Sequence, residues 1–208
     1  MAAAAKQRIG IFGGTFDPVH LGHLILAEQC RELGRLDQVW FVPGARPPHK
    51  QERLRTPFAQ RVEMLALASA GHPAFRVEEL ENERPGLNYT VDTLEELHRR
   101  HPGNDWFLVI GSDTLADLPN WREPVRVLEL AGLLIWVRPG SPVLTPEQLR
   151  ASLRLPESVP LRYEIVHGPL IDISSSDLRR RVAEGRSLRY LVPRAVECYI
   201  RDKGLYRI

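Results

Sequence analysis

The stretch IGIFGGTFDPVHLGHLILAEQCREL, residues 9–33, joins a short apolar run, a turn rich in glycine and proline, and a segment with helical spacing of apolar residues. The run 9–14 predicts a buried strand, and 21–33 predicts a helix that begins near His20 or Leu21. Gly13 and Gly14 would end the strand and let backbone N–H groups approach a ligand closely, because neither carries a side chain. The stretch therefore predicts the first β-α step of an α/β fold.

The rest of the chain repeats this alternation. Further strands are predicted at 38–43, 75–80, 106–111, 133–138 and 163–168. Further helices are predicted at 58–70, 89–101, 122–130, 175–185 and 194–204. Strands that alternate with helices predict a parallel sheet flanked by helices on both faces. We expect a single α/β domain over residues 9–208, preceded by a flexible leader at 1–8.

Composition narrows the class of protein. The 208 residues are 43% hydrophobic and 26% charged, which is ordinary for a globular chain. A net charge of +2 is too small to indicate a nucleic-acid surface, and no apolar run approaches the ~18 residues of a membrane span. The start MAAAAKQR lacks the apolar region of a signal peptide, and two distant cysteines indicate free thiols. We expect a cytoplasmic protein without nucleic-acid or membrane partners, and the sequence is compatible with a homo-oligomer.

Candidate chemistry follows the predicted strands. Open parallel sheets bind ligands in the crevice beyond the carboxyl ends of their strands. Polar segments follow strands at 13–23, 43–50, 111–121 and 173–179. The long connection 43–57 is polar and rich in proline, and loops of that length in compact domains are commonly functional. These segments are therefore expected to meet at one edge of the sheet.

His20 and His23 lie three residues apart at the start of a predicted helix and share one of its faces. Three hypotheses fit such a pair: phosphate handling, hydrogen-bonded structural histidines and a metal site. A helix N-terminus carries partial positive charge and free N–H groups, so it favours an anion over a cation. Zinc would also need a third ligand, which no nearby residue supplies. Phosphate is therefore favoured, although the motif is neither G-x-G-x-x-G nor a Walker A loop.

The segment ISSSDLRRR, residues 173–181, offers a second helix N-terminus. Ser174, Ser175 and Ser176 supply hydroxyl donors and N-caps, and the guanidinium of Arg179 suits phosphate oxygens. The alternative is an ordinary helix cap followed by solvated arginines, which we favour for Arg180 and Arg181 and leave open for Ser175 and Arg179.

The remaining two segments are less specific. The RPPHK loop carries Arg46, His49 and Lys50, which fit either a functional loop or a polar connection. Asp113 after the fourth strand fits either an acceptor for ribose hydroxyls or a helix N-cap. Trp121 could offer a flat face to a planar ring or could pack into the core.

Together these residues closely resemble the bacterial nicotinate mononucleotide adenylyltransferases. GGTFDPVHLGH is similar to that family's T/HxGH signature, and ISSSDLRRR is similar to its ISSTxIR signature, with Ser176 for Thr and Leu178 for Ile. PPHK, NYTVDTL, GSD followed by Trp121, and the tail YLVPRAVECYIRDKGLY match in order and spacing. The resemblance extends from about Ile9 to Ile208.

The resemblance implies a Rossmann-like nucleotidyltransferase domain that converts ATP and nicotinate mononucleotide to deamido-NAD and pyrophosphate. Mg²⁺ would be bound through the ATP phosphates, with no metal site made by the protein. It implies catalytic roles for His20, His23 and Arg179. It implies ATP binding by Gly13, Gly14, His20, His23, Lys50, Gly111, Asp113, Ser174, Ser175 and Arg179. It implies binding of nicotinate mononucleotide by Thr15, Asn88, Tyr89, Thr90, Asp113 and Trp121.

The chemistry agrees with the resemblance. The attacking group would be a phosphate monoester, largely dianionic near neutral pH because its second pKa is ~6, so no strong general base is needed. His20 and His23 are therefore expected to donate to phosphate oxygens. Residues 88–93 read as a helix start, with Asn88 as a candidate cap, and free N–H groups near Thr90 would favour a carboxylate over an amide. The alternatives are adenylyl transfer to nicotinamide mononucleotide or phosphopantetheine, and a nucleotide-binding regulator without turnover.

Overall fold

The sheet has six parallel strands. The computed structural model describes residues 6–46, 56–138, 140–141 and 143–207. The strands are β1 (Arg8–Gly14), β2 (Gln38–Pro43), β3 (Phe75–Val77), β4 (Asp105–Gly111), β5 (Gly132–Trp136) and β6 (Tyr163–Val166). Their order is β3-β2-β1-β4-β5-β6, and every neighbouring pair is parallel. This is the strand order of a doubly wound Rossmann-like sheet, as the sequence predicted.

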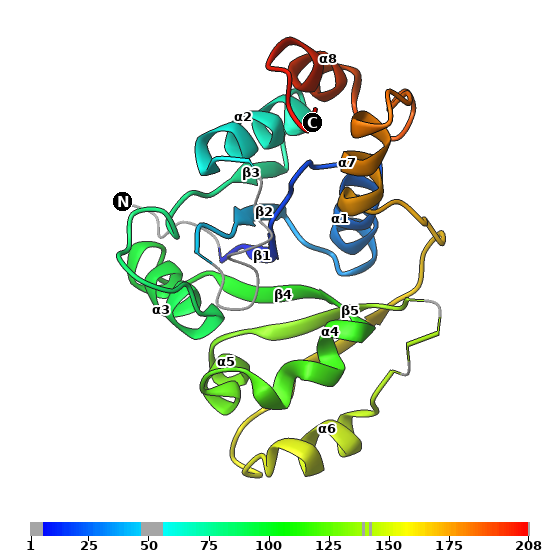
Figure 1. Cartoon of the computed structure of the whole chain (residues 1–208). Helices are drawn as coiled ribbons and strands as arrows, with labels where there is room; N and C mark the ends of the chain where they lie inside the picture. Colours follow the sequence, from blue (N-terminus) through cyan, green and yellow to red (C-terminus); the bar gives the residue numbers. More distant parts are fainter. Residues whose placement is uncertain (1–5, 47–55, 139, 142, 208) are drawn as a thin grey trace.

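Helices cover both faces of this sheet (Figure 1). They are α1 (Leu21–Leu33), α2 (Phe58–Ser69), α3 (Thr90–Arg100), α4 (Ser112–Asp117), the short 3₁₀ helix η2 (Leu118–Asn120), α5 (Pro124–Leu130), α6 (Pro146–Leu153), α7 (Ser175–Ala183) and α8 (Arg194–Asp202). Helices α3 to α6 pack on one face, and α1, α2, α7 and α8 pack on the other. The part of the chain that the structure describes contains no helix long and apolar enough to cross a membrane.

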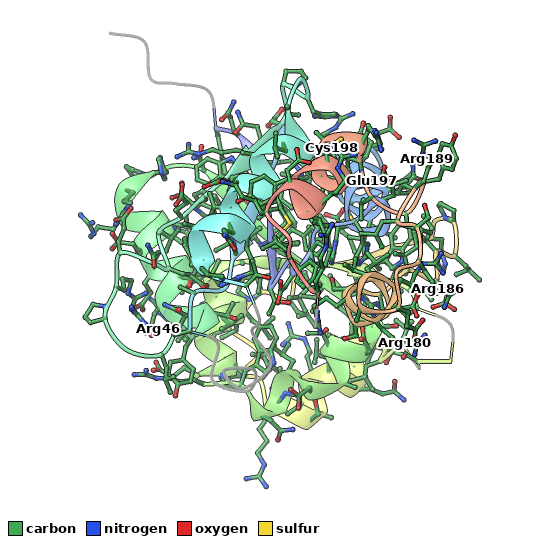
Figure 2. The ribbon with its side chains drawn as sticks, turned by 45° about the horizontal axis from the view of Figure 1, so that its top comes forward. Arg46, Arg180, Arg186, Arg189, Glu197 and Cys198 are labelled. Carbon is green, nitrogen blue, oxygen red and sulfur yellow. The ribbon has the colours of Figure 1, made fainter. Side chains whose placement is uncertain are left out.

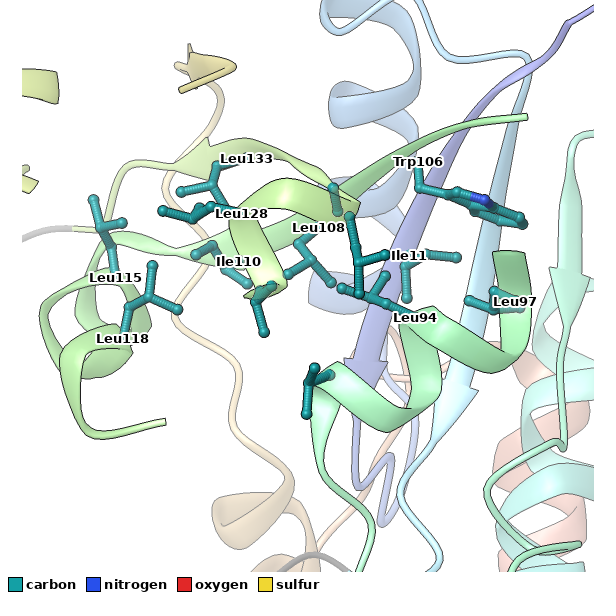
Figure 3. Packing of buried hydrophobic residues seen from close by; sticks show 14 of the residues in the cluster. Ile11, Leu94, Leu97, Trp106, Leu108, Ile110, Leu115, Leu118, Leu128 and Leu133 are labelled. Atoms are coloured by element: carbon teal, nitrogen blue, oxygen red, sulfur yellow. The ribbon is translucent and has the colours of Figure 1, made fainter. Parts of the chain in front are cut away.

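Strand side chains alternate between the two faces. In β4, Trp106, Leu108 and Ile110 belong to the apolar cluster under α3 and α5, which Figure 3 shows from close by. Phe107 and Val109 belong to the cluster on the opposite face. Both sets are buried because a parallel sheet with helices on each side exposes neither face. The strands therefore appear in the sequence as near-continuous apolar runs, because residues on both faces are buried.

The structure differs from the sequence prediction at several elements. The predicted strand 75–80 ends at Val77, because the chain turns at 79–83, where the Asn82 N–H donates to the Glu79 carbonyl at 2.9 Å. Helices α4 and α6 were not predicted. The start of α6 carries a capping box between Thr145 and Gln148, with Pro146 in the first turn. That signature was present in the sequence and went unassigned.

Candidate functional site

The strands β1 and β4 lie side by side at the point where the order of the sheet reverses. From β1 the chain continues toward β2 and β3, whereas from β4 it continues toward β5 and β6. Helix α1 follows β1 and α4 follows β4, so two helices begin at the same sheet edge. A Cβ placed on Gly13, at the end of β1, would meet no atom within 4 Å. A ligand therefore has room to approach the backbone there, as is usual at such a switch point.

His20 and His23 form one unit at the start of α1. His20 is the N-cap residue, and its backbone N–H donates to Nδ1 of His23 at 3.2 Å. The two rings are stacked, with centroids 3.6 Å apart and planes inclined by 25°. Gly22 makes this possible, because a Cβ there would lie only 3.0 Å from Nδ1 of His20. The structural role that the sequence left open is thus present: His23 satisfies a backbone N–H at the helix start.

Both imidazoles are neutral at pH 7. Burial, and to a lesser degree the charge of Arg138, lowers the pKa of His20 to about 4. Burial, the neighbouring His20 and Arg138 lower the pKa of His23 well below its usual value. Because Nδ1 of His23 accepts a hydrogen bond, its Nε2 carries the proton and is a donor. The pair can thus present N–H groups to an anion without bringing two cations together.

The second signature lies against the first. The Ser175 hydroxyl donates to the Pro18 carbonyl at 2.9 Å, and Arg179 donates to the Asp17 carbonyl at 2.6 Å. These contacts place the N-terminus of α7 beside the loop that precedes α1 (Figure 1). Ser174 is the N-cap of α7 and accepts from the Asp177 N–H at 3.1 Å, so its predicted capping role is confirmed. Two helix N-termini distant in sequence therefore meet at one place.

The next arginine, Arg180, does not join them. It lies on the outer surface of α7 (Figure 2) and pairs with Asp177 and Glu184. The sequence prediction of a solvated arginine at this position is confirmed. Arg179 and Arg180 are adjacent in sequence, but helical geometry directs only Arg179 toward the loop.

Asp113, Gly111 and Arg138 form a third group at the carboxyl ends of β4 and β5. The N-cap of α4 is Gly111, so the alternative that Asp113 caps this helix is wrong. Asp113 instead pairs with Nε of Arg138 at 3.4 Å. The Arg138 backbone N–H donates to the buried Ser112 hydroxyl at 3.0 Å. A Cβ on Gly111 would collide with both the Asp113 carboxylate and the Arg138 side chain, so glycine lets these two side chains lie against the end of β4.

Sequence reasoning missed Arg138. It stood at the end of a predicted strand, 133–138, and was assigned to the strand rather than to the site. In the structure β5 ends at Trp136, and the guanidinium of Arg138 acts electrostatically on both His20 and His23. The sequence did contain a signal for this residue: Arg138 is a basic residue that directly follows an apolar run, where an open parallel sheet binds its ligands.

Asn88, Tyr89 and Thr90 lie at the start of α3. The helix begins at Thr90, one residue after the predicted start at Tyr89. Its N-cap is Tyr89, so the prediction that Asn88 caps it is wrong. The Asn88 side chain is buried and bridges two backbone segments: it accepts from the Arg46 N–H at 2.6 Å and donates to the Glu81 carbonyl at 2.9 Å. Asn88 therefore fixes the chain before the helix. The first N–H groups of α3, at and after Thr90, lack partners within the helix.

Trp121 follows η2 and is partly buried against the same apolar cluster as Tyr89. Its neighbour Arg122 places its guanidinium 4.9 Å from the centre of the Tyr89 ring. The segment after η2 therefore lies beside the start of α3. The core-packing alternative for Trp121 is confirmed in part, because the residue packs on the core and also keeps an exposed portion.

Two predicted residues remain. Thr15 contributes its backbone carbonyl to Arg61, which donates at 2.7 Å from α2. Arg61 is fully buried and was not singled out in the sequence. Lys50 and His49 lie outside the described residues, as does most of the connection 43–57. Among the residues that are described, no group of three or more His, Cys, Asp or Glu side chains could hold a metal ion.

Comparison with known proteins identifies relatives of the whole chain. A family model described as cytidylyltransferase-like matches residues 11–181. A protein of Thermomicrobium roseum named probable nicotinate-nucleotide adenylyltransferase is 48% identical over 97% of this chain and 92% of its own length. A Thermus thermophilus protein of the same name is 47% identical over 97% of this chain and 100% of its own length.

Solved structures share the fold. The nicotinic acid mononucleotide adenylyltransferase of Plasmodium falciparum complexed with NaAD superposes with a TM-score of 0.77 at 20% identity, covering 96% of this chain and 97% of that one. The same enzyme complexed with APC gives a TM-score of 0.76 at 21% identity, with the same coverage.

Proposed function

The chain belongs to the cytidylyltransferase-like family, and from that premise we propose that it transfers the adenylyl group of ATP to nicotinate mononucleotide, giving deamido-NAD and pyrophosphate. The curated relatives carry the name of this activity. The observation that carries the proposal is the meeting of two helix N-termini, those of α1 and α7, with the His20–His23 pair at the switch point of the sheet. Helix N-termini carry partial positive charge and favour anions, and two of them suit a polyphosphate.

The ATP phosphates would bind between α1 and α7. The neutral histidines donate N–H groups, and Arg179 and Arg138 supply positive charge. A pKa of about 4 makes His20 a poor proton acceptor at neutral pH. That property suits a reaction whose nucleophile is already a phosphate dianion. The catalytic contribution of His20, His23 and Arg179 is then to hold the α-phosphate in line with the attacking oxygen and to stabilise charge on the leaving pyrophosphate.

The remaining ATP contacts would come from the ends of β1 and β4. Gly13, Gly14 and Gly111 would contact ATP through their backbone. Gly13 leaves β1 open, whereas the Phe16 ring lies at the Cβ position of Gly14, and Asp113 and Arg138 lie at that of Gly111. Asp113 would orient ribose hydroxyls. Ser174 and Ser175 would present the first turn of α7, and Lys50 would reach the phosphates from its loop.

Mg²⁺ would accompany ATP. The donors at the site are N–H groups and guanidinium groups, which fit phosphate oxygens and do not fit a metal held by the protein. When bound to ATP, the ion supplies charge neutralisation at the phosphate oxygens. The protein residues around it hold the phosphates.

Nicotinate mononucleotide would bind between the start of α3 and the segment after η2. The ring carboxylate would accept from the free N–H groups near Thr90, because its oxygens only accept. The partly exposed face of Trp121 would stack on the ring, with Tyr89 and Asn88 shaping the same region. Thr15 and Asp113 would lie on the ribose phosphate side.

We also propose a cytoplasmic location, which the free thiols Cys30 and Cys198 support.

The proposal is tested by identifying the products. The protein is incubated with Mg²⁺, nicotinate mononucleotide and ATP labelled separately at the α- and γ-phosphates. The expected result is α-label in deamido-NAD and γ-label in pyrophosphate, in equal amounts. Release of α-label as AMP, or product only with phosphopantetheine as acceptor, would contradict the proposal.

A further inference from the structure

We propose that Tyr206, in the tail after α8, is a positioning residue that holds the β1–α1 loop (residues 15–20) through Asp17. The loop carries His20 and precedes His23, so its shape sets where both imidazoles lie. The kinetic part of this inference rests on the proposed adenylyl transfer, whereas its structural part does not.

The contact spans almost the whole chain. The Tyr206 hydroxyl donates to Oδ1 of Asp17 at 2.7 Å, across 189 positions in sequence. Burial first, and then the charge of Asp17, raises the pKa of Tyr206 far above its usual value. The phenol therefore stays protonated and keeps donating throughout the neutral pH range. Its ring also packs against the apolar cluster that contains Phe16, the residue before Asp17.

Asp17 takes contacts from two elements at once. Its side chain accepts from Tyr206, and its backbone carbonyl accepts from Arg179 of α7 at 2.6 Å. Arg61 of α2 holds the same loop two residues earlier, through the Thr15 carbonyl at 2.7 Å. The loop is thus fixed by α2, by α7 and by the tail. Of these three contacts, only the one from Tyr206 reaches a loop side chain rather than a carbonyl.

The backbone supports this interpretation. Phe16 has a φ of 49° and Tyr206 a φ of 64°, and both are non-glycine residues in the left-handed region. Such conformations are uncommon for bulky side chains and persist where the surroundings fix them. Here one such residue precedes Asp17 in the loop, and the other is the residue that binds its carboxylate. The contact therefore joins two strained positions.

The test removes the hydroxyl and nothing else. Tyr206→Phe keeps the ring in the apolar cluster and breaks the contacts of the hydroxyl with Asp17 and with the Thr56 side chain. Thr56→Val removes the second contact alone and should leave the histidine signals in place. Tyr199→Phe is the matched control, because it removes a hydroxyl from the same C-terminal region that lies beside Glu63 of α2 instead of the loop. We measure kcat, the KM for ATP, the melting temperature and the ring Cε1–H signals of His20 and His23 by NMR, assigned by substitution.

We expect Tyr206→Phe to lower kcat about 10- to 100-fold, because small displacements of reacting groups cost rate, while the KM for ATP changes less. The signals of His20 and His23 should shift. Tyr199→Phe should keep the kcat and the histidine signals of the parent. A wild-type kcat in Tyr206→Phe, or a loss of kcat with both histidine signals unmoved, would overturn the proposal. If the parent protein does not transfer adenylyl groups, the proposed function fails, and the NMR comparison still decides the positioning role.

Discussion

The backbone N–H of His20 donates to Nδ1 of His23, and the rings of these two residues stack 3.6 Å apart. One contact thus caps helix α1 and fixes which nitrogen of His23 carries its proton. The second ring nitrogen, Nε2, is left as a donor at the anion-binding end of the helix. The capping role and the proposed phosphate role therefore use opposite atoms of the same ring.

His23→Gln separates the two roles. Glutamine at this position can still reach back to the N-cap N–H, as in a capping box, but it does not place a ring N–H at the phosphates. We expect kcat to fall about 10²- to 10³-fold, since losing one transition-state donor typically costs that much. Steady-state kinetics measures the phosphate role, and the melting temperature measures the capping role.

The control for this variant is His72→Gln, which changes a histidine that stacks on Phe75 and pairs with Glu28. It should keep the kcat of the parent protein. Turnover by folded His23→Gln within about twofold of the parent would contradict the donor role.

Stability should depend on pH through His20. Its folded pKa is about 4, against 6.5 for a solvent-exposed histidine, so between these values the unfolded chain binds more protons. Stability therefore rises with pH in this window, is fully present above pH 6.5 and is lost as pH falls toward 4. The contribution of His20 is about 3 kcal/mol. Urea unfolding at pH 5 and pH 7.5 measures the difference. His20→Asn retains a good N-cap residue and should reduce the dependence, with His23 supplying the remainder because its pKa is lowered too. An unchanged slope in that variant would refute the assignment to His20.

Gly111→Ala tests the close approach at the end of β4. The added methyl would collide with Asp113 and Arg138 and push both away from the crevice. We expect a higher KM for ATP and a lower kcat, with a small change in melting temperature because Asp113 and Arg138 are exposed.

Gly13→Ala is the matched control at the neighbouring strand, where a Cβ meets no atom of the protein within 4 Å. It should fold normally but lose ATP affinity if the backbone of β1 faces the nucleotide. Unchanged kinetics in Gly111→Ala would show that Asp113 and Arg138 do not act on ATP.

Chelation should separate the metal from the fold. Because Mg²⁺ is proposed to bind through ATP, EDTA should abolish turnover and leave the melting temperature of the nucleotide-free protein unchanged. Excess Mg²⁺ should restore activity fully. A fall in melting temperature on chelation would instead indicate an ion held by the protein itself.

Much of the fold could be predicted because its signals are local. The helix 21–33 has the predicted bounds, and the strands around Phe12 and Leu108 read as apolar runs because both of their faces are buried. Local signals also placed His20 at the start of α1. Helix α4 is too short for periodicity to reveal it. Helix α6 was missed although its capping box was visible.

The site was harder to predict because its contacts are long-range. The sequence indicated that His20 and Arg179 bear on one function, but not that Arg179 donates to Asp17 or that Ser175 donates to Pro18. Arg61 lies in no matched stretch. Tyr206 ends the tail that resembles the family, but nothing near it in the sequence indicates a contact with a loop 189 positions away. Asn88 was misassigned because asparagine before a helix usually caps it, and here its side chain bridges Arg46 and Glu81 instead.

The most direct test of the account is kcat/KM for nicotinate mononucleotide and nicotinamide mononucleotide, measured side by side with ATP and Mg²⁺. The free N–H groups at the start of α3 favour the ring carboxylate, because an amide would point its NH₂ at donors. Mispairing such groups costs about 10²- to 10⁴-fold in kcat/KM, so we expect the acid to be preferred by that ratio. Equal values for the two mononucleotides, or a preference for the amide, would contradict the assignment of nicotinate mononucleotide as the acceptor.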